Sequence, residues 1–419
     1  MRGHFGRLSR SMITTSILYI AGPGSMLSQE VPPDSGKVAY PVLKVDGQVR
    51  LRGEGDGRTV DVDPDFGVLS RLRVGLNASL YEWIDVYAQI QDARAWGSEL
   101  NTLTDASADA LDLHQGYVDL GSGPGFTARL GRQEVKLGDE RLVGAVDWTN
   151  TGRSFDGARI LGEAGGFSWT AFWMTIVERD SLLVVGLDPQ LNQGENDDGW
   201  LIGGFASRKF GDVNAEFTAL FDRDAVTDES YTANLRLHGR TGIVLYEMAG
   251  AYQFGPDRSA WFASARAGVA IGSATVAAQV DYLSGDDEAD DGETNAFRTL
   301  YATNHKFYGY MDYFLAPALQ LDAAGLVDGM LRGSWNVSGD KSLRIDAHRF
   351  STAEERGGSR ALGTEIDLVG VWSPANPANV QAGFGVFVPE SLATDFLPAF
   401  ERGDSTTWWG FVQLTVAWK

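Results

Sequence analysis

The stretch LKVDGQVRLR, residues 43–52, alternates apolar and polar side chains with a period of two residues. Successive side chains of a β-strand point to opposite faces, so this stretch predicts a strand with one apolar and one polar face. The apolar face consists of Leu43, Val45, Val49 and Leu51. The polar face consists of Lys44, Asp46, Gln48, Arg50 and Arg52.

The same alternation continues to the end of the 419-residue chain without a helix-length apolar run. Eighteen strands are predicted near residues 37–52, 66–80, 83–94, 111–120, 126–138, 153–163, 167–179, 199–210, 212–223, 230–241, 243–254, 259–271, 274–284, 325–338, 341–350, 361–373, 380–388 and 406–419. An even number of antiparallel strands places both ends of the chain on the same side. This repetition favours an all-β fold, a transmembrane antiparallel β-barrel of about eighteen strands.

The connections between the predicted strands alternate between short and long. Short turns are expected near residues 81–82, 121–125, 164–166, 211, 242, 272–273, 339–340 and 374–379. Long loops are expected near residues 53–65, 95–110, 139–152, 180–198, 285–324, 351–360 and 389–405. Two connections on the long side, 224–229 and 255–258, are short. Bacterial outer-membrane barrels have short periplasmic turns and long extracellular loops, whereas a soluble β-sandwich has no reason to sort its loops this way.

The two ends of the chain agree with an outer-membrane location. Residues 1–28 combine early arginines with a moderately apolar stretch, which predicts a signal peptide followed by a single barrel domain over 29–419. The alternative is an unstructured start. The last strand places Val412, Leu414, Val416 and Trp418 on one face, which resembles the terminal signal for barrel insertion, although Lys419 follows the last aromatic residue.

Composition excludes several classes of function. The chain has no cysteine, so disulfides and thiolate chemistry are excluded, and its mean hydropathy of −0.16 is far from that of a helical membrane protein. The formal net charge of −21 argues against nucleic acid as a partner. The histidines are scattered and form no catalytic or zinc-binding spacing, so we expect neither an enzyme nor a cofactor nor a specific metal site.

The alternation also assigns charged side chains to the lumen, because a charge facing lipid near the bilayer centre is costly. Inward-facing arginines include Arg50, Arg129, Arg236 and Arg344. Inward-facing acids include Asp85, Glu216, Asp281, Asp328, Asp346, Glu365 and Asp367. Each arginine could pair with a carboxylate and have a purely structural role. Alternatively, a group of unpaired arginines could form an anion path through a constriction.

One stretch is denser in charged residues and glycines than any strand requires. It runs from Gly131-Arg132-Gln133-Glu134 through residues 138–144 (GDERLVG) and 147–150 (DWTN) to residues 152–159 (GRSFDGAR). A second unusual stretch covers residues 305–314 (HKFYGYMDYF). Both stretches resemble the alginate export family of bacterial outer-membrane β-barrels. The resemblance covers essentially the whole chain after residue 28, and that family's barrel also has eighteen strands.

The resemblance implies passive transport of an anionic, alginate-like polysaccharide across the outer membrane. Arg132, Arg141, Arg153 and Arg159 would then grip uronate carboxylates at a constriction, together with the lumen arginines named above. In the alternative, Asp139, Asp147 and Asp156 neutralise these arginines in a salt-bridge network that folds the loop onto the barrel wall. Arg132 lies on the apolar face of its strand, so we expect it beyond the bilayer edge or beside a bulge.

The expected partners are outer-membrane lipid, an anionic polysaccharide or small solutes, and periplasmic export proteins. Acidic runs lie at 195–198, 222–229 and 286–293, and they are either solvated loops or places where divalent cations bridge carboxylates. Two other functions compete with export. One is a general uptake porin for carbohydrates or organic anions, and the other is a plugged barrel with a structural or adhesive role.

Overall fold

The computed structural model describes residues 40–97, 111–121, 125–177, 199–223, 229–288 and 291–419. Residues 40–419 belong to one compact unit. The predicted signal peptide, residues 1–28, lies outside the described residues. The strands are β1 (Val42–Gly57), β2 (Asp65–Tyr81), β3 (Ile84–Ala95), β4 (Leu111–Leu120), β5 (Phe126–Gln133), β6 (Phe155–Ala164), β7 (Phe167–Val177), β8 (Gly199–Phe210), β9 (Val213–Arg223), β10 (Ser230–Thr241), β11 (Val244–Gly255), β12 (Arg258–Ile271), β13 (Ala274–Leu283), β14 (Leu326–Ser338), β15 (Lys341–Arg356), β16 (Ser359–Ala375), β17 (Ala378–Pro389) and β18 (Thr407–Trp418).

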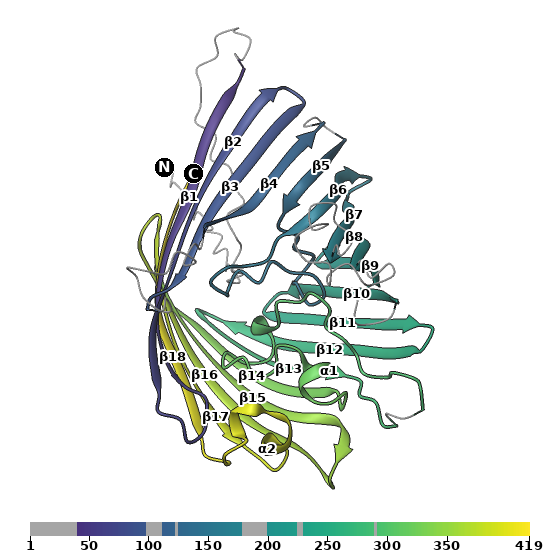
Figure 1. The fold of residues 1–419 in the computed structure, drawn as a ribbon, viewed down its shortest axis with the longest axis vertical. Helices are drawn as coiled ribbons and strands as arrows, with labels where there is room; N and C mark the ends of the chain where they lie inside the picture. The colour runs from purple at the N-terminus through teal and green to yellow at the C-terminus, as the bar shows by residue number, and fades with distance from the viewer. Residues whose placement is uncertain (1–39, 98–110, 122–124, 178–198, 224–228, 289–290) are drawn as a thin grey trace, which may run out of the picture. The chain divides into compact units, whose positions relative to one another are not determined.

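The eighteen strands form one closed antiparallel sheet, as the sequence predicts. Each strand pairs with its neighbours in the chain (Figure 1), and β1 also pairs with β18 from Gly47 opposite Trp418 to Gly57 opposite Trp408. Closure gives every described strand two partners, so the unpaired backbone groups of a sheet edge are avoided. This fold class is therefore confirmed.

The two faces of the sheet follow the predicted alternation. On β1, Val45 is 54% exposed on the outer face, whereas Arg50 is 4% exposed on the inner face. Large apolar side chains are exposed in the same way on strands around the barrel, including Leu130, Leu235, Val280, Ile366 and Phe384. None of the described helices is long and apolar enough to cross a membrane. The apolar outer face is the surface that would contact lipid.

Some strand ends differ from the prediction. The strand predicted over 126–138 ends at Gln133, because the chain turns away from the wall at Glu134. The prediction of a long loop at residues 351–360 is wrong. β15 continues to Arg356 and β16 begins at Ser359, so only Gly357 and Gly358 connect the two strands. Both glycines have positive φ, which suits a tight hairpin turn.

Two long loops fold into the space inside the barrel. The β5–β6 loop covers residues 134–154, and the β13–β14 loop covers residues 284–325 with a 3-10 turn at Asn304–Lys306 and helix α1 at Pro317–Gln320. Their apolar side chains form much of the buried core, including Val135, Val143, Phe297, Tyr308, Met311 and Phe314. The loops join where Gly144 N donates to Tyr301 O at 2.8 Å and Tyr301 N donates to Leu142 O at 2.9 Å.

A third loop lies between β17 and β18 and contains helix α2 (Ala393–Phe396) and a 3-10 turn at Pro398–Phe400. Its Phe400 packs against Tyr313 of the β13–β14 loop with ring centroids 5.4 Å apart. The interior of the barrel is therefore packed by loops from three connections on one side of the sheet.

The outward-facing positions predict how much an introduced charge lowers the stability of the barrel in lipid. Val412, near the middle of β18, is 60% exposed, and Ile271, the last residue of β12, is 69% exposed. We expect Val412→Arg to lower the free energy of unfolding in lipid vesicles by about 2–4 kcal/mol, and Ile271→Arg by only about 0–1 kcal/mol, because the cost falls toward the bilayer surface. Urea titration of the folded barrel measures both values. Equal costs at the two positions would contradict this membrane placement.

Candidate functional site

Four arginines on two neighbouring strands hold one side of the β5–β6 loop. Arg50 and Arg52 come from β1, and Arg71 and Arg73 come from β2, with Arg50 directly opposite Arg71 in the register. Alternation aims all four side chains inward, where they are buried. The four guanidinium groups lie near one another on the lumen wall, and we call them the arginine wall.

The arginine wall donates hydrogen bonds to backbone carbonyls of the loop. The main contacts are Arg50 Nη1 to Asp147 O at 2.7 Å, Arg50 Nη2 to Thr149 O at 2.5 Å, Arg52 Nη1 to Trp148 O at 2.8 Å and Arg73 Nη2 to Thr151 O at 3.1 Å. Buried carbonyls outside regular structure need such donors. The Asp147 carboxylate adds ion pairs, 2.9 Å from Arg71 Nη2 and 3.0 Å from Arg73 Nη1.

The start of the same loop is held by His114 on β4. An extra residue at His114 interrupts the β3–β4 register, so both His114 and Gln115 can face inward. His114 Nε2 lies 2.9 Å from Glu134 Oε1. Burial would raise the pKa of Glu134, but the hydrogen bond to His114 and the charges of Lys136 and Arg73 lower this pKa to about 2. Glu134 is thus ionised at neutral pH.

The other side of the β5–β6 loop reaches strands far around the barrel. Arg141 Nη1 lies 2.8 Å from Asp281 Oδ2 on β13, and Asp139 lies 3.3 Å from Arg236 on β10. Arg236 also pairs with Glu216 at 2.8 Å and with Glu247 at 3.1 Å. Because β2 is separated from β10 and from β13 by at least six strands in either direction around the closed sheet, the loop crosses the lumen.

The β13–β14 loop is held by acidic side chains. Met311 N donates to Glu365 Oε1 at 2.9 Å, and Tyr310 N donates to Asp367 Oδ2 at 3.3 Å, both on the inner face of β16. The two loops are tied together by Lys306, whose Nζ lies 2.5 Å from Glu140 Oε1. The lumen is therefore narrowed by two loops that are bound to its wall and to each other.

An aromatic stack adds to the contact between the loops. Trp148 of the β5–β6 loop lies parallel to His305 of the β13–β14 loop, with ring centroids 4.1 Å apart. Arg52 lies over the ring of Trp148, 4.6 Å from its centroid. His305 Nδ1 is 2.6 Å from the Asp312 carboxylate, so this part of the loop is fixed by a hydrogen bond as well as by packing.

Five of the eight predicted substrate arginines have a carboxylate partner. These pairs are Arg129–Asp119 at 2.8 Å, Arg132–Asp156 at 3.7 Å, Arg141–Asp281 at 2.8 Å, Arg236–Glu216 at 2.8 Å and Arg344–Asp346 at 3.1 Å. For the loop residue Arg141 the pair is buried, which is the structural alternative that the sequence left open. Arg132 projects from the predicted apolar face, at the end of β5.

The other three predicted arginines have no carboxylate within ion-pair distance among the described residues. Arg50 contacts loop carbonyls, Arg153 Nη1 donates to Tyr301 O at 2.5 Å, and Arg159 Nε donates to Thr170 Oγ1 at 2.9 Å. The predicted partners Asp139 and Asp156 lie beside motif arginines, whereas Asp147 pairs with Arg71 and Arg73 of the arginine wall. Arg52, Arg71 and Arg73 were not among the predicted substrate arginines, and only the alternation of their strands directs them to the lumen.

The acidic runs are only partly described. Residues 195–198, 224–228 and 290 lie outside the described residues. Asp222 pairs with Arg298 at 3.0 Å, and Asp286 is buried beside Arg356, whose Nη2 donates to the Asp286 carbonyl at 2.6 Å. Within the described part of the chain, no group of three potential ligands could hold a metal ion.

Several solved structures share this fold. The outer membrane protein OpdK from Pseudomonas aeruginosa is 11% identical, with 90% of this chain and 98% of that chain covered and a TM-score of 0.59. OccAB4 from Acinetobacter baumannii is 8% identical, with 90% and 98% covered and a TM-score of 0.59. OpdK solved with vanillate is 12% identical, with 89% and 98% covered and a TM-score of 0.58. At these identities the likeness shows the fold alone.

A closed eighteen-strand sheet with an apolar outer face and inward-folded loops defines the class of outer-membrane β-barrel channels. The family model described as alginate export matches residues 43–392, and the chain belongs to this family. The family and the fold are those of transport porins rather than enzymes, and their location is the cell outer membrane. No curated protein sequence matches the chain significantly.

The arginine wall makes a prediction about the loop. Replacing Arg71 and Arg73 together by methionine removes both ion-pair partners of Asp147 and the Arg73 hydrogen bond to Thr151 O. We expect the β5–β6 loop to detach from the wall and the single-channel conductance in planar bilayers to rise, with more current noise. Arg94→Gln is the control, because Arg94 pairs with Asp92 on an exposed part of β3. Unchanged conductance in the double variant would contradict the assigned role.

The Glu134 contact makes a prediction about pH. The pKa of Glu134 is lowered from 4.5 to about 2, so its stabilising effect is fully present above pH 4.5 and is lost as pH falls toward 2. We expect the conductance of the wild-type channel to change as pH falls below 4.5. In Glu134→Gln this acid-dependent change should be reduced. An identical acid response in both proteins would count against Glu134 as the titrating group.

Proposed function

We propose that this outer-membrane channel passes carboxylate-bearing solutes passively, and that Arg159 is the lumen cation that meets them. The observation that carries the proposal is the absence of any carboxylate partner for Arg159 among the described residues. A lumen guanidinium without a carboxylate partner keeps its capacity to bind a passing carboxylate, ideally through two parallel hydrogen bonds.

The surroundings of Arg159 support this role. Arg159 lies directly opposite Arg129 in the β5–β6 register, and the outward neighbours Leu130 and Ile160 are exposed, so both guanidinium groups are on the inner face. Arg129 is neutralised by Asp119 through two contacts of 2.8 Å and lies 3.7 Å from the centre of the Tyr117 ring. The group of two arginines and one carboxylate therefore has one net positive charge.

Two classes of carboxylated solute fit a cationic lumen. The family match favours uronate-containing, alginate-like polysaccharide. The inward loops, which are fixed to both walls, favour small organic anions taken up by diffusion, and OpdK, which shares the fold, was solved with vanillate. Reversal potentials and block of the current by polyuronate separate these classes. A barrel that conducts no ions would instead support the structural or adhesive role.

The selectivity prediction concerns Arg159 alone. One charge at 4 Å in water is worth about 1 kcal/mol, so we expect Arg159→Gln to lower the anion-to-cation permeability ratio by up to about fivefold. Reversal potentials in a salt gradient across a planar bilayer measure this ratio. The matched control combines Arg129→Gln with Asp119→Asn, which removes an ion pair without changing the net charge. A ratio that is unchanged by Arg159→Gln would overturn the proposal.

A further inference from the structure

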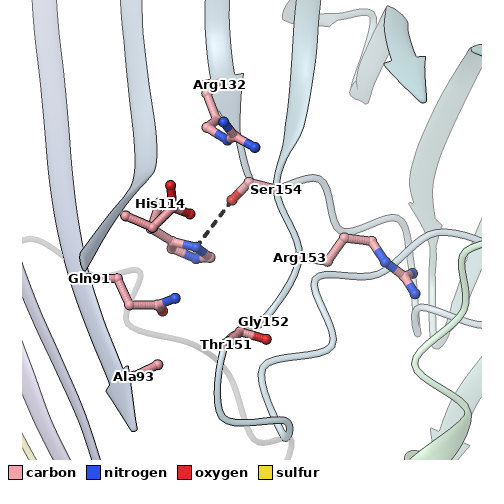
Figure 2. A pocket seen from close by; sticks show the side chains of 9 residues that line it. Gln91, Ala93, His114, Arg132, Thr151, Gly152, Arg153 and Ser154 are labelled. Carbon is pink, nitrogen blue, oxygen red and sulfur yellow. Dashed lines mark hydrogen bonds between the residues drawn. The ribbon is translucent and has the colours of Figure 1, made fainter. Parts of the chain in front are cut away.

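A pocket of about 470 Å³ lies beside the start of β4 (Figure 2). Pairing between β4 and β5 stops at Gly116 opposite Arg132. Pairing between β3 and β4 continues to Asp92 opposite Leu111, so the β3–β4 hairpin extends beyond β5. The β5–β6 loop returns past this overhang at Thr151–Ser154 and forms the facing side of the pocket.

Three side chains form a hydrogen-bonded chain that reaches this pocket. Ser154 Oγ lies 3.4 Å from His114 Nδ1, as the dashed line in Figure 2 marks, and His114 Nε2 lies 2.9 Å from Glu134 Oε1. His114 is buried, Ser154 is half-buried, and both line the pocket. A hydroxyl, an imidazole and a carboxylate in this order are the parts of a hydrolytic triad, which is identified by geometry rather than by sequence position.

The charge of Glu134 decides the role of each ring nitrogen of His114. Glu134 is ionised at neutral pH, so its Oε1 can only accept a hydrogen bond. His114 Nε2 must therefore carry the hydrogen, which leaves the lone pair of the neutral ring on Nδ1. Because Nδ1 is the nitrogen next to Ser154, it can take the hydroxyl proton as a general base. Contacts between a nucleophile and its base are often this long before substrate binds.

His114 differs from the other histidines that contact carboxylates, which are His238, His305 and His348. Among the described residues, none of these three has a serine or threonine hydroxyl as the partner of its other ring nitrogen. The contact with Glu134 explains how His114 anchors the β5–β6 loop. It does not explain why the second nitrogen of His114 faces a hydroxyl at a cavity.

Other side chains of the lining can stabilise the negative charge that forms when a carbonyl is attacked. Arg132 Nε has no hydrogen-bond partner among the described residues, and Arg132 Nη2 is 3.7 Å from Asp156 Oδ2. Gln91 Oε1 accepts from Arg73 Nε, which leaves the Nε2 hydrogens of Gln91 as donors. Donors positioned for a developing oxyanion are a large part of catalysis in acyl transfer.

The pocket is built into the fold. Gly152 has a φ of +74°, and a Cβ atom at this position would lie 2.7 Å from Arg73 Nη2. Only glycine lets the loop come this close to the wall without strain. Ser154 is therefore held next to His114 before any ligand arrives.

We propose that Ser154, His114 and Glu134 are a hydrolytic triad that cleaves esters of short-chain carboxylic acids in this pocket, in addition to transport. A volume of about 470 Å³ lies in the range of small-molecule sites. Ala93 is an apolar side chain of the lining against which a short acyl chain fits. The inference does not rest on the proposed function, because hydrolysis requires no flow of solute through the lumen.

Hydrolysis proceeds through an acyl-serine. Ser154 Oγ attacks the ester carbonyl carbon while His114 Nδ1 takes the hydroxyl proton, and Arg132 and Gln91 stabilise the negative oxygen. The bond to the alcohol oxygen then breaks, and His114 returns the proton to the leaving alcohol. His114 next takes a proton from water, whose oxygen attacks the acyl-serine carbonyl carbon. The carboxylic acid leaves as Ser154 recovers its proton from His114, while Glu134 holds the imidazole in orientation.

The test measures hydrolysis of p-nitrophenyl acetate by the folded full-length channel in detergent, after subtraction of the rate in buffer. General acid–base catalysis contributes about 100-fold or more, so we expect Ser154→Ala and His114→Gln each to lower kcat/KM by at least that factor. Ser338→Ala is the matched control and should keep wild-type activity, because Ser338 ends β14 and bonds to Asp340. Circular dichroism verifies the β-sheet content of each variant.

Covalent labelling gives a second readout that needs no variant. Diisopropyl fluorophosphate phosphorylates an activated serine with loss of fluoride, so we expect mass spectrometry of the wild type to find the adduct on Ser154. Wild-type hydrolysis no faster than buffer, full activity in Ser154→Ala, or a label on other residues and not on Ser154 would each overturn the triad. If Ser154→Ala or His114→Gln does not fold, the labelling result decides.

Glu134 is a positioning residue in this triad, because it acts only through His114. We expect Glu134→Gln to lower kcat and to leave KM unchanged, since the change does not touch the substrate. Glu134→Asp keeps a carboxylate and should recover part of the lost kcat. A wild-type kcat in Glu134→Gln would remove Glu134 from the triad and contradict the proposal.

Discussion

The structure depends on how irregular backbone is satisfied inside a closed barrel. A loop that enters the lumen loses water from its N–H and C=O groups, and each group then needs a partner. The arginine wall on β1 and β2 donates to carbonyls of the β5–β6 loop. Glu365 and Asp367 on β16 accept from amides of the β13–β14 loop. The cations on β1 and β2 thus face carbonyl oxygens, the negative end of the peptide dipole. The carboxylates on β16 face amide hydrogens, the positive end.

This division of charge reconciles an acidic protein with a cationic path. The formal net charge is −21, yet most described lumen carboxylates are engaged by arginine, histidine or backbone amides. Arg159 has neither a carboxylate partner nor a loop carbonyl, and it differs in this way from the neighbouring Arg129. A total charge therefore says little about a pore, because pairing decides which charges a solute meets.

Much of the barrel could be predicted from local pattern, since a strand alternates its faces whatever its neighbours are. The strands predicted at 111–120, 199–210 and 230–241 match β4, β8 and β10 in both bounds. The errors fall where tertiary contacts override the pattern. Residues 134–138 alternate like a strand but enter the lumen, and residues 351–356 extend β15 although they were expected in a loop. The motif was correctly singled out, but Asp147 was matched to arginines near it in sequence rather than to Arg71 and Arg73.

The sequence by itself determined the closed antiparallel barrel and the inward direction of its charged side chains. It also determined which family the chain resembles. These properties follow from alternation and from a dense local motif, both of which depend on residues near one another in the chain. The tertiary structure alone decided which arginines are neutralised, because partners such as Arg141 and Asp281 are separated by 140 residues. It also decided that two loops fold into the lumen and that a pocket forms at Arg132, since both depend on contacts between strands and loops far apart in the sequence.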